Sequence, residues 1–289
     1  MNLRQKINAA RTRLVAAGIE NGEAGRDANL LARHLLGWDR ARLMTRETDD
    51  ATDPFIAGYD RLIERRARRE PVGYIRGEQE FWSHDYAVNR SVLIPRPETE
   101  LIVEELLSFM PDNLPARKAR VADIGTGSGC LAIAAAAECP LIEVIATDVS
   151  KAALDVARGN ARRYGVEHRI TFVEAAYVPT SMGPFDFILS NPPYVTTSEY
   201  QDLAPEVRDY EPAHALVAGD DGLRDIRQII DIASTSLAPG GIALIEIGHH
   251  HAEPVTALVK GVRQLTLKRI SLDLQRIPRV AVIERKIVE

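Results

Sequence analysis

Over the first 70 residues, apolar side chains recur at spacings of three and four, which places them on one face of a helix. Glycines at positions 18, 22 and 37 interrupt the pattern. Because glycine breaks helices, we predict several short helices that pack as a small bundle. The apolar series are formed by Leu3, Ile7, Ala10 and Leu14, and by Leu30, Leu31 and Leu35.

A further helix is predicted from Asp53, since aspartate followed by proline is typical of a helix N-cap and its first residue. This segment runs to Arg69 and carries five arginines within its last nine residues. Two interpretations are open: a docking surface for an anionic partner, or a solvated helix face partly neutralised by Glu64 and Glu70. The arginines are Arg61, Arg65, Arg66, Arg68 and Arg69.

The pattern changes to short alternating stretches between Glu78 and Ile94, which predicts a β-hairpin that links two domains. After Pro97, apolar strand-like runs alternate with alanine-rich helical stretches, which is typical of a doubly wound α/β fold with a parallel sheet. We therefore expect a helical domain over 1–78, a hairpin linker over 79–95 and an α/β domain over 96–289. The expected strands are Arg120–Ile124, Val144–Thr147, Ile170–Val173, Phe185–Ser190, Ile242–Ile247 and Val280–Ile283, with helices from Gly129 and after Ser150.

The 289 residues are 45% hydrophobic and 27% charged, which excludes wholesale disorder, a collagen-like repeat and a coiled coil. A formal net charge of −5 excludes a surface that attracts nucleic acid everywhere. Apolar stretches such as Cys130 to Ala137 are shorter than the roughly 18 residues that cross a bilayer. We expect a cytoplasmic protein without membrane contact, whose Cys130 and Cys139 stay reduced and bind no metal.

The first candidate site is the glycine-rich segment Asp123 to Gly129, which lies between an expected strand and an expected helix. Glycine allows the backbone to approach a ligand, and the following helix offers free N–H groups. A dinucleotide fingerprint would need glycine or alanine where Cys130 stands. The G-x-G-x-G spacing after an acidic residue instead resembles the first motif of S-adenosylmethionine-dependent methyltransferases, whose loop cradles the cofactor. The alternative is a tight turn without a ligand.

Asp148 ends the next expected strand, which would place it across a crevice from the glycine loop. A carboxylate there can accept both ribose hydroxyls of a nicotinamide or an adenosylmethionine cofactor. It can also serve as the N-cap of the helix that starts near Ser150.

The segment Asn191-Pro192-Pro193-Tyr194 follows an apolar strand. Two prolines make the loop rigid and leave its carbonyl groups free to accept hydrogen bonds. The Asn191 side-chain oxygen and the Pro192 carbonyl can together hold a planar NH₂ group, orient it toward a sulfonium methyl and stabilise the charge that it gains. Tyr194 would stack on the flat substrate group. The alternative is a polar turn after a strand.

Nearly the whole chain resembles the HemK-type glutamine N5-methyltransferases that modify class I peptide chain release factors. Besides the two loops, the matching segments are Glu70 to Gly77, Glu80 to Trp82, Val92 to Glu100, Glu211-Pro212, Ala215-Leu216, Gly219 to Leu223 and Glu246 to Gly248. Within them, Pro95-Arg96-Pro97-Glu98-Thr99-Glu100 favours the release-factor branch over sister enzymes that act on a large-subunit ribosomal protein.

This resemblance implies a Rossmann-like class I methyltransferase sheet of seven strands with a small N-terminal helical bundle that docks the release factor. It implies that Gly125, Thr126, Gly127, Ser128, Gly129, Asp148 and Asn191 bind S-adenosylmethionine and its product S-adenosylhomocysteine. Asn191, Pro192, Pro193 and Tyr194 would bind the glutamine of the Gly-Gly-Gln loop, with Asn191 and Pro192 catalytic. We expect a monomer without specific nucleic-acid binding.

Two positions depart from the family pattern. Where relatives carry an Asp-Trp pair near the adenine, this chain has Ala175-Ala176, so that Glu174 or Tyr177 substitutes or the pocket is looser. The family's Gly-x-x-Gln is replaced by Gly248 and three histidines at 249–251. Adjacent side chains point in different directions, and no cysteine or carboxylate cluster supports a metal site there.

Two other functions are consistent with these residues. The same loop chemistry suits methylation of the adenine amino group in DNA or RNA, which needs a flipped base and a basic reading surface. Apart from the segment 61–69, the sequence shows no such surface. The second is an idle scaffold that binds release factors or ribosomes without catalysis, and adenosylmethionine binding would distinguish it from an enzyme.

Overall fold

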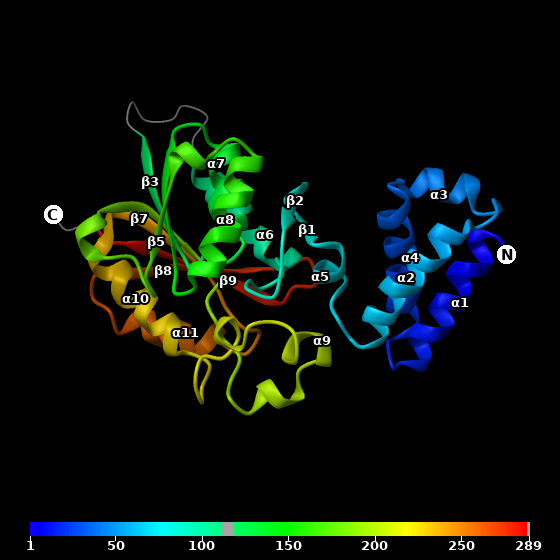
Figure 1. Cartoon of the computed structure of the whole chain (residues 1–289). Coiled ribbons are helices and arrows are strands. Elements are labelled where there is room, and N and C mark those ends of the chain that lie inside the picture. Colours follow the sequence, from blue (N-terminus) through cyan, green and yellow to red (C-terminus); the bar gives the residue numbers. More distant parts are fainter. Residues whose placement is uncertain (111–117, 288–289) are drawn as a thin grey trace. The chain divides into compact units, whose positions relative to one another are not determined.

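A computed structural model describes residues 1–110 and 118–287, which divide into two compact units (Figure 1). The helical unit comprises Met1–Glu78 together with Ala204–Tyr210. The sheet unit comprises Gln79–Leu203 and Glu211–Glu289. The described residues contain no helix that is both long and apolar enough to cross a membrane.

The helical unit is the predicted bundle. The residues at spacings of three and four, among them Leu3, Ile7, Leu14 and Leu31, are buried in its core together with Tyr59. The Tyr59 hydroxyl donates to the Ala28 carbonyl at 2.8 Å, so the one polar atom of this ring is satisfied inside the core. The helices are α1 (Leu3–Ala16), α2 (Asn21–Leu36), α3 (Arg40–Arg46), α4 (Asp53–Ala67) and α5 (Val72–Arg76), with the short α9 (Pro205–Arg208) from the second segment.

The start of α4 corrects one prediction. Its N-cap is Thr52, whose hydroxyl accepts from the Phe55 N–H at 3.4 Å, and Asp53 is already helical. Threonine is as able as aspartate to cap a helix, and proline is tolerated throughout the first turn, so the dipeptide fixes the start only to within one residue.

Arg66 fits neither interpretation of the arginine-rich segment. Its side chain is 2% exposed, and its guanidinium contacts Asp27 at 2.6 Å, Glu23 at 2.7 Å and Glu206 at 3.0 Å. A cation that is buried and paired in this way is available neither to an anionic partner nor to solvent. Its function is to hold α2, α4 and the second segment of the unit together.

The neighbouring arginines are also paired inside the helical unit. Arg65 forms two hydrogen bonds of 2.8 Å with Glu70, Arg68 contacts Glu64, and Arg69 contacts Glu206 at 2.5 Å. The segment therefore offers an anionic partner much less free positive charge than its composition suggests.

The segment Ala204–Tyr210 departs from the expected domain boundaries, which left it in the α/β domain. Glu206 pairs with Arg66 and Arg69, and the Tyr210 hydroxyl donates to the Arg68 carbonyl at 2.6 Å. These long-range contacts, 137 to 142 residues apart in the chain, have no local sequence signal.

The sheet unit begins with a hairpin formed by β1 (Glu78–Phe81) and β2 (His84–Ala87), which is shorter than the predicted 79–95 because residues 88–95 form no strand. Within the described residues, seven further strands form one sheet in the order β5-β4-β3-β6-β7-β9-β8. These are β3 (Ala119–Ile124), β4 (Ile142–Asp148), β5 (Ile170–Glu174), β6 (Phe185–Ser190), β7 (Leu237–Glu246), β8 (Leu265–Leu272) and β9 (Pro278–Arg285). The predicted doubly wound α/β fold is confirmed.

The sheet is parallel from β5 to β7, whereas β9 runs antiparallel between β7 and β8. The apolar pattern predicts that Val280–Ile283 form a strand but does not encode its direction. The edge strand β8 was not predicted from the sequence pattern, because Lys268 and Arg269 interrupt its alternation of apolar residues. An exposed edge strand tolerates such charges.

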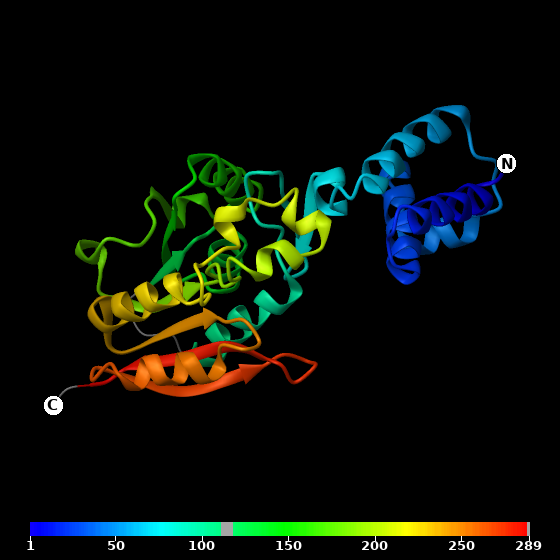
Figure 2. The same cartoon turned by 90° about the horizontal axis from the view of Figure 1, so that it is seen from below.

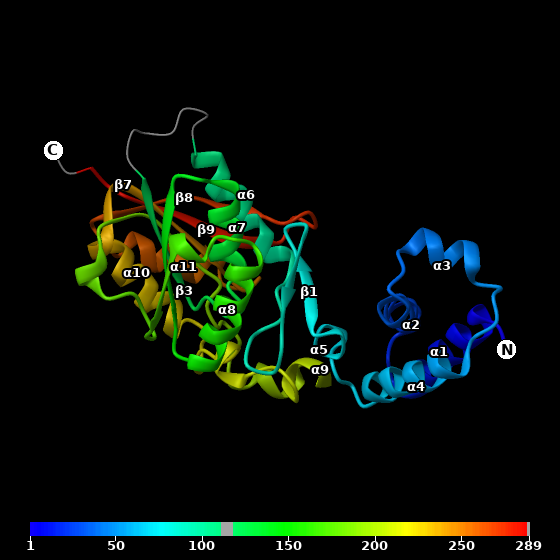
Figure 3. The ribbon, with the colours of Figure 1, turned by 45° about the horizontal axis from the view of Figure 1, so that its top comes forward.

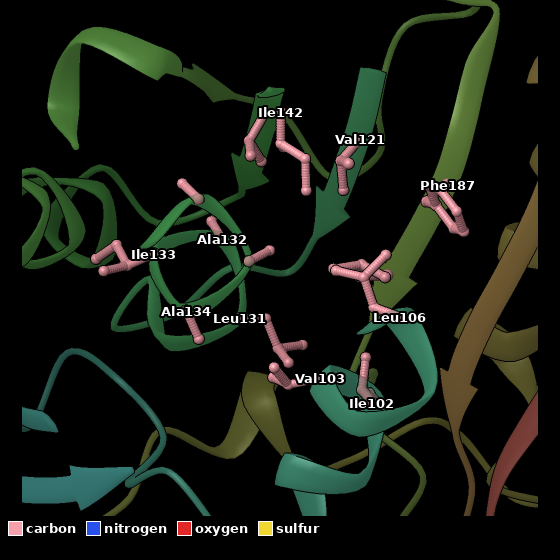
Figure 4. Packing of buried hydrophobic residues seen from close by; sticks show 14 of the residues in the cluster. Ile102, Val103, Leu106, Val121, Leu131, Ala132, Ile133, Ala134, Ile142 and Phe187 are labelled. Carbon is pink, nitrogen blue, oxygen red and sulfur yellow. The ribbon is translucent and has the colours of Figure 1, made fainter. Parts of the chain in front are cut away.

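Helices cover both faces of the sheet. Figure 3 shows α6 (Glu100–Phe109), α7 (Cys130–Glu138) and α8 (Lys151–Arg163) on one face, and in Figure 4 Leu106 and Leu131 pack toward Val121 and Phe187. Figure 2 shows α10 (Arg224–Ser236) and α11 (Ala252–Lys260) on the other face. Short 3₁₀ turns lie at Pro97–Thr99, Glu167–Arg169, Thr180–Met182, Glu199–Asp202 and Ala213–Ala215.

Candidate functional site

The strand order places the two predicted loops side by side. β3 lies between β4 and β6, so the chain winds in opposite directions on either side of β3, and ligands bind at such a reversal beyond the carboxyl ends of the strands. The glycine loop follows β3, and Asn191 follows β6. The buried Ser190 hydroxyl donates to the Ile124 carbonyl at 2.7 Å, which joins the ends of these two strands.

The glycine loop follows a path that only glycine adopts readily. Gly125, Gly127 and Gly129 have φ of 74°, 53° and 83°. The N–H groups of Gly125 and Thr126 both donate to the Thr147 carbonyl, which ties the loop to β4. A Cβ at Gly129 would lie 2.9 Å from Ile133 and 3.1 Å from Ala157, so this glycine allows α7 and α8 to pack closely.

Asp123 holds the glycine loop through hydrogen bonds. Its Oδ2 accepts from the Thr126 hydroxyl at 2.6 Å and from the Ala132 N–H at 3.2 Å, across the start of α7. The side chain is fully buried, and burial raises its pKa to about 7. Its other oxygen, Oδ1, has no partner among the described residues.

A second brace comes from Asn160 on α8, which is 1% exposed. Its amide exchanges hydrogen bonds with the backbone N–H and carbonyl of Ala87, at 2.8 and 3.1 Å, and donates to the Ser128 carbonyl at 2.8 Å. The glycine loop is thus connected to the end of the hairpin. The sequence did not mark Asn160 as a site residue, because a single asparagine within a helical pattern gives no signal.

Asp148 lies where the sequence predicts it, at the carboxyl end of β4. Its Oδ2 accepts from the Gly127 N–H at 2.9 Å, and its Oδ1 accepts from the Ser150 N–H at 2.8 Å. The interpretation of Asp148 as the N-cap of α8 is wrong, because Ser150 caps this helix through its own hydroxyl. The carboxylate is 8% exposed and lines a cavity, with lone pairs left for a ligand.

The second loop is fixed at both ends. The Asn191 side-chain NH₂ donates to the Thr99 hydroxyl at 2.9 Å, and the Tyr194 hydroxyl donates to Glu246 at 3.3 Å. Beyond the loop, Val195 pairs in parallel with Val217. The Tyr194 ring packs edge-on against His251 rather than along the cavity wall, so the predicted stacking of Tyr194 on a substrate stays a prediction.

The cavity between the two loops has a volume of about 300 Å³. Both predicted loops line it, through Gly125, Thr126, Gly127, Ser128, Asn191 and Pro193, and so does Asp148. Gly129 and Pro192, although predicted, are not among the lining residues. Residues outside the predicted set also line it: Ser91, Val92, Leu93, Pro95, Thr99, Cys130, Leu131, Val149, Ala176, Tyr177, His214, Ala215, Arg224 and Asp225.

The segment with the sequence Pro-Arg-Pro-Glu-Thr-Glu connects this cavity to the rest of the unit. Arg96 donates to the buried Glu211 at 2.5 Å, and Glu211 also accepts from the Ile94 N–H at 3.1 Å. Glu100 accepts from the Trp82 N–H at 2.8 Å. The motif was visible in the sequence, but its long-range partners were not.

Of the two candidates to replace the aromatic residue that Ala175-Ala176 lacks, only Tyr177 lies at the cavity. It lines the cavity, and its hydroxyl donates to Asp225 at 2.8 Å, whereas Glu174 is exposed and outside the cavity wall. Partial burial and the neighbouring Asp225 carboxylate raise the Tyr177 pKa to about 12, so the hydroxyl stays a donor at neutral pH.

The three histidines lie at the start of α11. His249 and His250 are exposed, while His251 contacts the Tyr194 ring. In the described part of the chain, no group of three histidine, cysteine or acidic side chains is arranged to hold a metal ion.

Two protein families match this chain. The PrmC N-terminal domain matches residues 5–77, and the Methyltransferase small domain matches residues 102–207. The two matches fall on the helical unit and the sheet unit, apart from the segment Ala204–Tyr210.

Three relatives with similarity along most of the chain share one name. A release factor glutamine methyltransferase of Bradyrhizobium diazoefficiens is 37% identical over 98% of this chain and 95% of its own length. One of Koribacter versatilis is 39% identical over 98% of both chains, and one of Cereibacter sphaeroides is 42% identical over 90% of both.

Solved structures support the fold alone. The hMettl16 catalytic domain in complex with an RNA hairpin of the MAT2A 3′UTR is 18% identical, with a TM-score of 0.55 over 82% of this chain and 84% of that one. A methyltransferase from Pyrococcus furiosus is 20% identical, with a TM-score of 0.51 over 72% of this chain and 91% of that one.

Proposed function

Since the chain belongs to the release factor glutamine methyltransferase family, we propose that it methylates the glutamine of the Gly-Gly-Gln motif in class I peptide chain release factors. The methyl group would come from S-adenosylmethionine and would be transferred to the side-chain amide nitrogen, N5. The accompanying expectations of a cytoplasmic monomer without specific nucleic-acid binding belong to this proposal.

The residues of the glycine loop fit S-adenosylmethionine. A Cβ at Gly125 or Gly127 would meet no atom within 4 Å, so the backbone here is bare and faces open space at the cavity. Ser128 also lines the cavity, and in the described part of the chain its buried Oγ has no hydrogen-bond partner. Bare backbone beside a polar atom that lacks a partner is what a polar ligand needs.

The loop from Gly125 to Gly129, Asp148 and Asn191 would hold the cofactor. Its sulfonium supplies an electrophilic methyl group when bound. Asp148 is already oriented by Gly127 and Ser150, so it would accept hydrogen bonds from ribose hydroxyls without first losing rotamer freedom.

The loop Asn191 to Tyr194 supplies the acceptor chemistry. An amide nitrogen is a weak nucleophile because its lone pair is delocalised. The Asn191 Oδ1 and the Pro192 carbonyl would each accept one hydrogen of the glutamine NH₂, which orients it and stabilises its growing positive charge. Pro193 and Tyr194 would border the substrate. The position of Asn191 on the wall shared with the glycine loop carries this proposal.

Mass spectrometry of a purified release factor after incubation with the protein and S-adenosylmethionine tests the reaction. The expected result is the mass gain of one methyl group on the Gly-Gly-Gln peptide. A release factor with alanine in place of that glutamine is the control and gains nothing. Unchanged mass in both, with S-adenosylmethionine bound, would contradict the proposal and direct attention to another NH₂ acceptor.

The role of Asp148 has its own test. Asp148→Ala is expected to raise the dissociation constant for S-adenosylmethionine about 10- to 100-fold, the range for losing charge-assisted hydrogen bonds. Isothermal titration calorimetry measures it, and Asp155→Ala, an exposed aspartate of α8 paired with Lys151, is the matched control. An unchanged constant in Asp148→Ala would remove this residue from the pocket.

A further inference from the structure

Hydrogen bonds at the cavity wall hold the Asn191 side chain. The Asn191 Nδ2 donates to the Thr99 Oγ1 at 2.9 Å, and the Thr99 hydroxyl donates to the Glu246 Oε2 at 2.6 Å. Asn191 follows β6, Thr99 ends the 3₁₀ turn before α6, and Glu246 ends β7. The three residues are far apart in the chain and come into contact only in the folded sheet unit.

The direction of these bonds determines what Asn191 presents to the cavity. A threonine hydroxyl has a single hydrogen, and an ionised carboxylate can only accept. Because the Thr99 hydrogen points at Glu246, the Thr99 oxygen offers only lone pairs to Asn191. Thr99 therefore binds the NH₂ of Asn191 rather than the Asn191 oxygen. The Asn191 Oδ1 is then the free end of the amide, and it is an acceptor.

The same carboxylate holds the other end of the loop. The Glu246 Oε1 accepts from the Tyr194 hydroxyl at 3.3 Å. Pro192 and Pro193 lie between the two attachment points and add stiffness because their φ angles are fixed. One side chain that is 1% exposed thus sets both ends of Asn191 to Tyr194.

We propose that Glu246 and Thr99 are positioning residues that select the orientation of the Asn191 amide in which its oxygen, and not its NH₂, faces the substrate NH₂. The inference rests on the proposed function. It adds that the site recognises a hydrogen-bond donor only while Glu246 is charged.

Protonation of Glu246 reverses the direction of the hydrogen bonds that Thr99 makes with Glu246 and Asn191. Burial raises the Glu246 pKa to about 7, although Thr99, Arg279 and Tyr194 oppose this rise. As pH falls through this value, Glu246 gains a proton and can donate to Thr99. The Thr99 hydrogen is then free to point at Asn191, which favours the flipped amide. The Asn191 NH₂ would then face the substrate NH₂, so that two hydrogen-bond donors would oppose each other.

Other charged and titratable groups lie near this carboxylate. Arg279 of β9 and Glu98 of the 3₁₀ turn act on it directly, and the Cys130 thiol at the start of α7 stays neutral because burial raises its pKa to about 12. His251 touches Tyr194, and its pKa is lowered by burial. The test therefore has to separate Glu246 from His251.

Thr99→Val removes the hydroxyl at nearly constant volume. It is expected to lower kcat for release factor methylation about 10- to 100-fold, the range for residues that orient a functional group. The dissociation constant for S-adenosylmethionine should stay within about twofold, because Asn191 itself remains. Thr99→Ser keeps the hydroxyl and should retain most of kcat. A wild-type kcat in Thr99→Val, or an equal loss in Thr99→Ser, would overturn the inference.

The Asn191 side-chain NH₂ resonance, followed by NMR in the free full-length protein, reports the orientation without substrate. In the wild type it should titrate with a midpoint near pH 7, and in Glu246→Gln the titration should disappear. It should persist in His251→Gln. A resonance that does not shift with pH in the wild type, or that still titrates in Glu246→Gln, would refute the inference. Failure of wild-type methylation would instead refute the proposed function.

Discussion

Asn191→Ala is expected to lower kcat at least about 100-fold, the scale for losing one preorganised polar group at a reacting centre. The variant loses an acceptor for the substrate NH₂ and one of the residues proposed to hold S-adenosylmethionine, but it keeps the glycine loop and Asp148. The dissociation constant for S-adenosylmethionine should therefore change much less than kcat. Steady-state methylation of a release factor gives kcat, and calorimetry gives the constant.

A matched control is Asn29→Ala, which removes an exposed amide of α2 that donates to the Gly25 carbonyl. It should leave kcat unchanged. A loss of less than about tenfold in Asn191→Ala, well below the range for such groups, would exclude the orienting role of Asn191.

Arg66→Ala is expected to lower the free energy of unfolding by about 3–5 kcal/mol, the cost of removing one partner from a buried ion pair. Asp27 and Glu206, whose side chains are 12% and 14% exposed, would be left without their shared cation. Urea denaturation of the full chain, followed by circular dichroism, measures the change.

The neighbouring Arg68 is the control, because its side chain is 74% exposed and pairs with Glu64 one helical turn away. Arg68→Ala should cost less than about 1 kcal/mol. Equal costs for the two variants would mean that burial does not determine the role of Arg66. Replacing the arginines of 61–69 together would measure this loss of stability, so it is no test of docking.

The sequence predicted most of the strands and both loops, because each depends on local pattern. Phe185–Ser190 is the observed β6 to the residue, and the loops meet because carboxyl ends of parallel strands share one edge. Partners distant in the chain could not be predicted. Nothing near Glu246 in the sequence indicates Thr99, and nothing near Arg66 indicates Glu206.

The surroundings of Ala175-Ala176 could not be predicted from the sequence either. The sequence left three alternatives, in which Glu174 substitutes, Tyr177 substitutes, or the pocket is looser. In the structure β5 ends at Glu174, which is exposed, while the chain beyond it brings Tyr177 to the cavity, which favours Tyr177 over Glu174. Asp225, which anchors the Tyr177 hydroxyl, comes from α10 and has no relation to this segment in the sequence.

The path of the chain at Ala204–Tyr210 affects how the protein can be divided. The backbone leaves the sheet unit after Leu203, contributes Glu206 to the helical unit and returns at Glu211, so the units are joined by three covalent crossings rather than one. A truncation at residue 78 would yield a helical fragment without Glu206, one of the counterions of its buried Arg66. A protease cut after residue 78 would divide the chain into 1–78 and 79–289, and only noncovalent contacts of Ala204–Tyr210, such as those of Glu206 with Arg66 and Arg69, would then hold the two pieces together.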